Sequence, residues 1–361
     1  MQHFGDTKHI GKAVAEAIAI RLMRSYDFSG GAPTVDDLSK LPNVTDISAA
    51  TVTDKVILMN SLCKNPRQKF VFEALVRHLH DFTREVSLTS EEWMASIKFL
   101  TDVGHITSDI RQEFILLSDI FGWSALVDSL NHPIKAGSNA SEATVLGPFF
   151  VEDSKKAGAA SSAIENGESI ASEGAGEYLF MSGKVLDTEG NGIPHCTIET
   201  WETDQEGLYD TQYGNTMNDY KADCRGRLKT DKDGRYYFRG IRPVAYPIPN
   251  DGPVGKLLHT MGRHVFRPSH LHMWFQATDF EPLITALYPS GDDYIGSDAV
   301  FGVKSSLICN LTPSYDDEKA KKLGFKQAPF WELDWNFILQ SKDQALVEKK
   351  KSLPHYYRFA K

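Results

Sequence analysis

The chain has 361 residues, 41% of them hydrophobic and 24% charged, which is enough for one large domain or two ordinary domains with substantial cores. Its formal net charge of −9 disfavours a nucleic acid or an anionic membrane surface as the partner. The first residues lack a signal-peptide pattern, and no apolar run is long enough to span a membrane, so we expect a cytoplasmic protein. The four scattered cysteines predict reduced thiols rather than a disulfide framework.

The N-terminal third has the apolar spacing of helices. Apolar residues recur at helical intervals within 10–22 and within 72–82. The sequence Thr-Ser-Glu-Glu at 89–92 is a capping-box pattern that opens a further helix, and another helix is expected within 107–122. We therefore predict an all-α helical domain over residues 1–133.

The composition changes after residue 133. Residues 144–150 form an extended segment, and residues 152–177 are rich in Ala, Ser, Gly and Glu without periodicity, which predicts a surface loop. We assign 134–177 to a connector and pocket-rim segment.

Short strands between turn signals are expected from residue 178 onward. Their spacing predicts an antiparallel β-sandwich catalytic domain over 178–312, with a hairpin turn at 231–234. Residues 313–361 are expected to be a C-terminal extension that packs on this domain and contains a strand-like stretch at 330–337. The other expected strands lie at 180–186, 196–201, 226–230, 236–239, 271–275 and 299–308.

Two histidines on an expected strand indicate a metal site. Side chains two residues apart on a strand share a face, so His270 and His272 converge. His78 and His80 have the same spacing in a helical stretch, where they are rotated by about 200° and cannot share a ligand. Imidazole suits zinc, copper, iron or nickel. Taken alone, the pair fits two buried, hydrogen-bonded histidines equally well.

Three segments of the sandwich half resemble the intradiol ring-cleavage dioxygenase family: 201–209, 245–249 and 267–272. The helical N-terminal half and the Leu-Gly-Pro-Phe sequence at 146–149 resemble its catechol and hydroxyquinol branch. The resemblance implies a mononuclear non-haem iron, Fe(III), with the ligands Tyr209, Tyr246, His270 and His272.

The residue types agree with a ferric ion. A phenol has a pKa of about 10 and ionises at neutral pH only beside a strong Lewis acid, so two tyrosinates indicate a hard, highly charged metal. Tyrosinate ligation of ferric iron occurs in catalase. Ferrous facial-triad oxygenases instead use two histidines and one carboxylate.

The resemblance also implies individual roles. Tyr246 would be the ligand that leaves the metal and takes a substrate proton, and Arg267 would stabilise negative charge on the substrate. Asp119 would accept the additional hydroxyl of benzene-1,2,4-triol, although by residue pattern alone it is a solvated charge on a helix face. Ala286 departs from the glutamine of catechol enzymes. The substrate-binding positions that match the hydroxyquinol branch are Leu116, Asp119, Leu146, Gly147, Pro148, Phe149, Ile248, Pro249, Arg267 and Val300.

The resulting hypothesis is a hydroxyquinol 1,2-dioxygenase that uses O2 to form 3-hydroxy-cis,cis-muconate, which tautomerises to maleylacetate. The alternatives are a catechol or chlorocatechol 1,2-dioxygenase, a zinc-dependent hydrolase, and a non-catalytic β-sandwich binding module. The resemblance further implies a homodimer formed through the helical domain, which can also hold a phospholipid.

Overall fold

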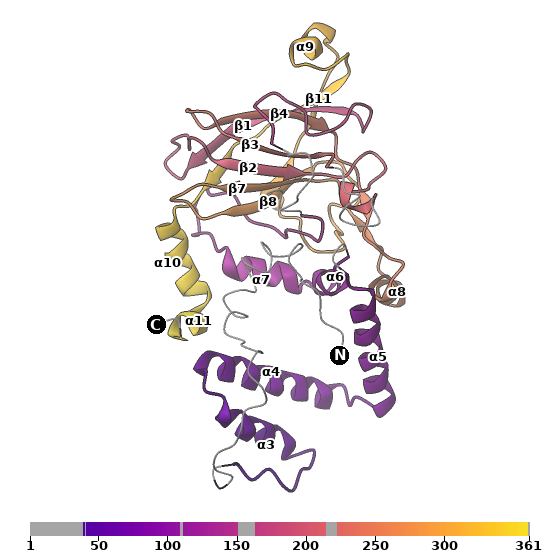
Figure 1. The fold of residues 1–361 in the computed structure, drawn as a ribbon, viewed down its shortest axis with the longest axis vertical. Helices are drawn as coiled ribbons and strands as arrows, with labels where there is room; N and C mark the ends of the chain where they lie inside the picture. The colour runs from indigo at the N-terminus through magenta and orange to yellow at the C-terminus, as the bar shows by residue number, and fades with distance from the viewer. Residues whose placement is uncertain (1–38, 40, 109–110, 151–162, 214–221, 360–361) are drawn as a thin grey trace, which may run out of the picture. The chain divides into compact units, whose positions relative to one another are not determined.

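The computed structural model describes residues 39, 41–108, 111–150, 163–213 and 222–359 (Figure 1). The described part of residues 11–101, with the chain from Leu353 onward, forms one compact unit, and Asp102–Ser352 forms a second. The predicted helix within 10–22 lies outside the described residues. The predicted domain boundary at residue 133 stays a prediction.

The smaller unit is helical. Asn65 begins α4 because its side-chain oxygen accepts hydrogen bonds from the backbone N–H groups of Arg67 and Gln68. The predicted capping box is confirmed, since Thr89 N lies 2.9 Å from Glu92 Oε2 and Glu92 N lies 3.2 Å from Thr89 Oγ1. Its elements are α3 (Val52–Met59), the 3-10 turn η3 (Asn60–Leu62), α4 (Pro66–Glu85), α5 (Ser90–Ile106), which runs on into the second unit, and α11 (Pro354–Phe359).

The larger unit contains two five-stranded sheets and a two-stranded ribbon (Figure 1). The first sheet has the order β10 (Thr312–Ser314), β11 (Phe330–Asp334), β1 (Tyr178–Asp187), β12 (Phe337–Leu339), with β4 (Arg235–Ile241) also paired to β1. The second sheet has the order β3 (Arg225–Lys229), β2 (Thr197–Trp201), β7 (Leu271–Gln276), β8 (Leu283–Pro289), β9 (Ile308–Cys309). The ribbon pairs β5 (Tyr246–Pro247) with β6 (Phe266–Arg267). The other helices are α6 (Glu113–Ile120), α7 (Trp123–Asn131), α8 (Pro253–Thr260), α9 (Asp317–Lys322) and α10 (Lys342–Ser352).

The core lies between the two sheets, and strand alternation decides which side chains enter it. On β7, Leu271, Met273 and Phe275 join buried residues of the first sheet in one hydrophobic cluster. His272 therefore points to the opposite face of the second sheet, because side chains alternate along a strand. This face is the one that carries the candidate site.

A helical region followed by a β-sandwich is confirmed, but the prediction of a purely antiparallel sandwich is wrong. β11 and β12 both pair with β1 in parallel, and β9 pairs in parallel with β8. The parallel pairs within the first sheet form where the C-terminal strands β11 and β12 join successive parts of β1, the first strand of the domain.

The predicted hairpin at 231–234 is also wrong. The turn forms, with Gly234 N donating to Asp231 O at 3.1 Å, but β3 before it pairs with β2 and β4 after it pairs with β1. The turn thus passes the chain from one sheet to the other. A local turn signal fixes the reversal of the chain but not the strand's partner.

The remaining differences concern strand positions. Residues 299–308 form a loop with a 3-10 turn, and only Ile308 starts a strand. The strand-like stretch 330–337 is two strands, and β8 was not predicted. Within 163–177, Ile170 is 4% exposed and packs in the core, so this part of the expected surface loop is attached to the sheets.

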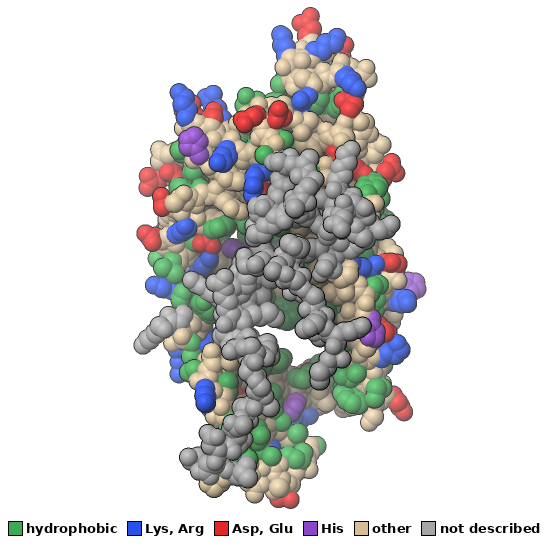
Figure 2. Space-filling model, in the orientation of Figure 1, with side chains coloured by type: hydrophobic (Ala, Val, Ile, Leu, Met, Phe, Trp, Pro, Cys, Tyr) green, Lys and Arg blue, Asp and Glu red, His purple; other side chains and the backbone are tan. Residues whose placement is uncertain are grey.

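Two further features concern the helices and the charged surface. Within the described ranges, each helix is too short or too polar to cross a bilayer. On the face shown in Figure 2, acidic and basic side chains are interspersed.

The break between β11 and β12 generates a prediction about Gly183. A methyl group at this position would overlap the carbonyl oxygen of Trp335. We expect Gly183→Ala to lower the free energy of unfolding by about 2–3 kcal/mol, because backbone must move to relieve the overlap. Urea denaturation measures this. Gly296→Ala is the control and should change the unfolding free energy by less than about 0.5 kcal/mol, since no atom lies within 4 Å of the added carbon. Equal effects of the two substitutions would contradict the packing argument.

Candidate metal centre

The four predicted ligands converge in the larger unit. His270 Nε2 lies 3.1 Å from His272 Nε2 and 3.3 Å from Tyr209 Oη. The ring of Tyr246 lies with its centroid 5.4 Å from that of Tyr209 and 5.6 Å from that of His270. All four side chains are buried, none with more than 2% of its surface exposed. The predicted convergence is therefore present, and their role as metal ligands remains a proposal.

Local structure places each histidine. His272 lies on β7, opposite Trp201 of β2 in the strand register, and the indole and imidazole rings stack with centroids 4.8 Å apart. His270 precedes β7 by one residue and keeps the same face. On the other side of His272, β8 contributes Ala286, a small and fully buried residue in register with it. His272 thus has an aromatic wall on one side and a methyl group on the other.

The two tyrosines come from a loop and from the two-stranded ribbon. Tyr246 pairs in register with Arg267 across β5 and β6. Tyr209 follows a turn at Gly207, which has a φ of +77°. Gly207 also lies close to Tyr246, since a carbon added to the glycine would be 3.0 Å from the Cβ atom of Tyr246. The Tyr209 ring stacks on Phe149 with centroids 4.5 Å apart. These contacts hold both phenols against the histidines.

His270 has a defined tautomer. Its Nδ1 lies 2.7 Å from the carbonyl oxygen of Pro268, which can only accept, so Nδ1 carries the proton. The lone pair on Nε2 then faces His272 and Tyr209. This arrangement is typical of metal-binding histidines, whose second nitrogen is oriented by a hydrogen bond to a carbonyl or carboxylate.

The histidine environment favours the neutral form. Burial, followed by the nearby Arg267 charge, lowers the pKa of His270 to about 3. Burial and the neighbouring His270 hold the pKa of His272 well below its usual value. Two neutral imidazoles therefore face each other through Nε2, and His272 Nδ1 has no hydrogen-bond partner among the described residues.

The donor set fits a bound cation. Two nitrogens, each about 2.1 Å from one metal ion, are about 3 Å apart when they occupy neighbouring coordination positions. The observed Nε2–Nε2 separation of 3.1 Å agrees with this value. Burial and the proximity of Tyr246 raise the pKa of Tyr209, so only a strongly charged ion would keep it as a phenolate. In the described part of the chain no three His, Cys, Asp or Glu side chains gather into a site, which leaves this tyrosine and histidine set as the candidate.

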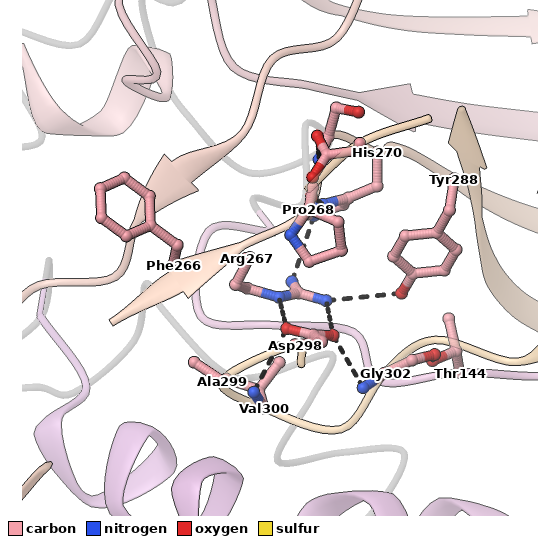
Figure 3. Close-up of polar contacts among 12 residues, drawn as sticks. Thr144, Phe266, Arg267, Pro268, His270, Tyr288, Asp298, Ala299, Val300 and Gly302 are labelled. Atoms are coloured by element: carbon pink, nitrogen blue, oxygen red, sulfur yellow. Dashed lines mark hydrogen bonds and ion pairs between the residues drawn. The ribbon is translucent and has the colours of Figure 1, made fainter. Parts of the chain in front are cut away.

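Arg267 lies beside His270 (Figure 3). Its Nη1 is 3.1 Å from His270 Nε2, and its Nε is 3.2 Å from Asp298 Oδ1. The guanidinium is 2% exposed. Burial lowers the pKa of the guanidinium, but the Asp298 charge and the nearby phenols raise it by more than burial lowers it. The net pKa is therefore raised, and the side chain is cationic. A positive charge is thus fixed at the edge of the candidate site.

Asp119 is buried rather than solvated, so its reading as an exposed helix-face charge is wrong. It is 3% exposed on α6. Burial raises its pKa to about 6, although a hydrogen bond from Ser124 and the positive charge of Arg267 lower it in part. Asp119 therefore feels the charge of Arg267, and its place in the substrate pocket stays a prediction.

The structure brings some of the predicted pocket residues to the donors and leaves others unassigned. Gly147 has a φ of +74°, and a carbon added to it would lie 3.8 Å from His272 Nε2. Val300 donates its backbone N–H to Asp298 at 3.2 Å. Five further positions are buried or half-buried, and their place in the pocket stays a prediction: Leu116, Leu146, Pro148, Ile248 and Pro249.

Sequence reasoning missed the residues that support the donors. Asp298 pairs with Arg267, and Asp210 pairs with Arg225 at 2.7 Å while lying next to Tyr209 in the chain. Tyr288 lies 3.4 Å from the Arg267 guanidinium. The sequence signal for such a carboxylate is the arginine itself, because a buried guanidinium is stable only when it is paired. The sequence does not specify which of many carboxylates it is.

Comparison with protein families agrees with this geometry. The family described as "Dioxygenase" matches residues 145–341, and "Catechol dioxygenase N terminus" matches residues 65–139. The intradiol ring-cleavage dioxygenase hqdA of Aspergillus niger is 46% identical over 305 residues, which cover 84% of this chain and 88% of that protein.

Two further relatives extend the comparison. A hydroxyquinol 1,2-dioxygenase of Rhizobium sp. is 44% identical over 77% of this chain and 90% of its own length. The crystal structure of hydroxyquinol 1,2-dioxygenase from Pseudomonas putida DLL-E4 superposes with a TM-score of 0.71 at 38% identity, over 81% of this chain and 99% of that one. Similarity of this extent in both sequence and fold places the chain in the intradiol ring-cleavage dioxygenase family.

Proposed function

We propose that this protein is a hydroxyquinol 1,2-dioxygenase that uses a ferric ion held by Tyr209, Tyr246, His270 and His272. The substrate is benzene-1,2,4-triol, and the bond between its two adjacent hydroxylated carbons is cleaved. Both atoms of O2 enter the product, 3-hydroxy-cis,cis-muconate, which tautomerises to maleylacetate. Relatives named hydroxyquinol 1,2-dioxygenase at 44–45% identity support this substrate.

The observation that carries the proposal is the convergence of two phenols and two neutral imidazoles in one buried site beside a fixed guanidinium. When bound, the ferric ion supplies the Lewis acidity that binds a 1,2-diol and makes its ring reactive toward O2. The Pro268 carbonyl fixes the proton of His270 on Nδ1, and the strand geometry brings the Nε2 atoms of the two histidines together. Family membership argues against the zinc hydrolase and the non-catalytic module.

The protein's own groups divide the remaining work. Tyr246 would accept a proton from a substrate hydroxyl at its Oη. Arg267 would donate N–H groups to the substrate oxygen on which negative charge develops, where low exposure strengthens the interaction. Phe149 would exclude water from the Tyr209 side of the site. Asp119 would accept the hydrogen of the third hydroxyl.

Catechol cleavage is the second candidate. A catechol 1,2-dioxygenase of Candida albicans is 36% identical over 76% of this chain. The buried Asp119 carboxylate favours the triol, because a site that hydrogen-bonds a substrate hydroxyl penalises the analogue without it.

We also propose that the chain forms a homodimer through its helical region and that this region can hold a phospholipid. The α4 helix exposes a continuous apolar stripe at helical spacing: Phe72, Leu75, Leu79 and Phe82 are 39–57% exposed. Exposed apolar stripes of this kind are typical of subunit contacts and lipid sites.

The first prediction tests the ligand set. Purified iron-loaded protein should be coloured by tyrosinate-to-iron charge transfer, and Tyr209→Phe and Tyr246→Phe should each weaken this absorption. His272→Ala should lower the bound iron by at least about tenfold, because losing one ligand removes much of the affinity. Elemental analysis and visible absorption spectra measure both effects. A colourless iron-loaded protein, or full iron content in His272→Ala, would contradict the assignment.

The second prediction concerns Asp119 and pH. The carboxylate accepts a hydroxyl best when ionised, so the ratio of kcat/KM for the triol to that for catechol should fall as the pH drops through about 6. Asp119→Asn should lower this ratio by about a hundredfold at neutral pH and remove its pH dependence. Parallel assays of the two substrates measure it. A wild-type preference for catechol would remove the proposed role of Asp119.

The third prediction concerns assembly. Leu75→Glu together with Leu79→Glu places two charges on the apolar stripe and should convert the dimer to a monomer in analytical ultracentrifugation. Arg77→Glu lies on another face of α4 and breaks only a surface ion pair with Glu73, so the dimer mass should persist. A monomeric wild-type protein would refute the dimer.

A further inference from the structure

Arg267 is held from two sides. Its guanidinium has five N–H groups, and a buried cation is costly unless these groups are paired. Asp298 accepts hydrogen bonds from Nε at 3.2 Å and from Nη2 at 3.4 Å, and the hydroxyl oxygen of Tyr288 accepts from Nη2 at 3.4 Å (Figure 3). The remaining nitrogen, Nη1, is directed at His270 Nε2. One edge of the guanidinium is thereby fixed to the protein, and Nη1 faces the donor set.

The Asp298 carboxylate is itself fixed by backbone. Its Oδ1 accepts from Val300 N at 3.2 Å, and its Oδ2 accepts from Gly302 N at 2.8 Å. Thr144 holds the same loop by donating its hydroxyl to the carbonyl oxygen of Gly302 at 2.5 Å. The orientation of the carboxylate is therefore set by main-chain donors, which have no rotamer freedom.

The contact is closely packed at Gly302. A carbon added to Gly302 would lie 2.8 Å from Tyr288 Oη and 2.9 Å from Arg267 Nη2. Tyr288 is fully buried on β8, and its ring lies with its centroid 5.6 Å from that of His270. Glycine thus allows the loop, the phenol and the guanidinium to meet at one point.

The direction of Nη1 matters because of its neighbour. A lone pair that coordinates a metal ion no longer accepts a hydrogen bond, so with His270 as a ligand the Nη1 donors are available to a substrate oxygen beside the metal. A donor stabilises developing charge only within hydrogen-bond distance and in the correct orientation. An arginine side chain has several rotatable bonds, so partners must fix it.

We propose that Asp298 and Tyr288 are positioning residues for ring cleavage, which hold the Arg267 guanidinium so that Nη1 faces the substrate oxygen where negative charge develops. This inference rests on the proposed function. It assigns a reaction role to an acid and a phenol that lie outside the ligand set.

The experiment compares Tyr288→Phe and Asp298→Asn with the wild type as iron-loaded, full-length proteins. Both substitutions keep the side-chain shape. Iron content, thermal unfolding, anaerobic binding of the triol and kcat in saturating O2 are measured. We expect kcat to fall about tenfold in Tyr288→Phe and about a hundredfold in Asp298→Asn, with the Kd for the triol changed by less than about threefold, because the charge develops after binding.

A double-mutant cycle separates positioning from a structural role. In an Arg267→Met background neither substitution should lower kcat further, since there is no guanidinium left to orient. Tyr236→Phe is the matched control: Tyr236 is also buried and donates its hydroxyl to Trp335 O at 2.7 Å, but it belongs to the first sheet. Its kcat should equal that of the wild type.

The outcomes are distinguishable. Unchanged kcat in both variants, or an equal loss with and without Arg267, would overturn the positioning role while leaving the proposed function intact. Iron-loaded wild-type protein that turns over neither triol nor catechol would overturn the proposed function, and this inference with it.

Discussion

Four polar side chains meet in the interior of the larger unit, and their burial governs the electrostatics of the site. The Nε2 lone pair of His270 has His272 Nε2 at 3.1 Å, Arg267 Nη1 at 3.1 Å and Tyr209 Oη at 3.3 Å. Buried polar groups are costly unless they are paired, and a metal ion among these four would pair with several of them at once. The Pro268 carbonyl and the stacked Trp201 ring nevertheless keep both imidazoles in this arrangement. The fold therefore holds the four groups in a geometry that suits the proposed metal ion.

Charge around the donors is arranged in compensated pairs. Arg267 and Arg225 are both buried, and each has its own carboxylate, Asp298 and Asp210. Removing one member of such a pair would leave an unpaired buried charge, which is strongly destabilising. The arginines are nonetheless near enough to lower the pKa of Tyr209 in part. The two guanidinium groups thus create a positive potential beside Tyr209, while their carboxylate partners keep the net buried charge low.

The second ion pair also links Tyr209 to Phe149. Arg225 donates to the carbonyl oxygen of Phe149 at 3.0 Å, and the Phe149 ring stacks on Tyr209. Asp210, its partner, directly follows Tyr209 in the chain. Arg225 therefore holds both Phe149, which stacks on the Tyr209 ring, and Asp210, which follows Tyr209 in the chain. The position of Tyr209 thus depends on Arg225 of β3.

Features set by neighbouring residues could be predicted from the sequence, and features set by distant partners could not. The Thr89–Glu92 capping box and the shared face of His270 and His272 depend on contacts within a few residues, and both are present. The turn at 231–234 also forms, but its flanking strands join different sheets, a choice decided by the packing of the whole domain.

The loop that follows Asp298 is another feature that the sequence pattern could not predict. Its apolar residues resemble a strand, yet the Asp298 side chain takes the backbone N–H groups of Val300 and Gly302 and replaces ladder bonding. That carboxylate is oriented by its own loop and serves Arg267, which lies 31 residues away in the chain. Sequence pattern gave the arginine, but only the structure could give its partner.

Burial of the Asp119 carboxyl group lowers the stability of the fold at neutral pH. Its pKa is raised from 3.8 to about 6, so the folded state binds the proton more tightly than the unfolded state does, and folding stability falls as the pH rises through this interval. Above about pH 6 the ionised form costs about 3 kcal/mol, at about 1.4 kcal/mol per pKa unit. An apolar residue on α6 would avoid this cost and would pack in the same buried position. A buried carboxylate that destabilises the fold is typical of a functional site, which agrees with the proposal that Asp119 accepts a substrate hydroxyl.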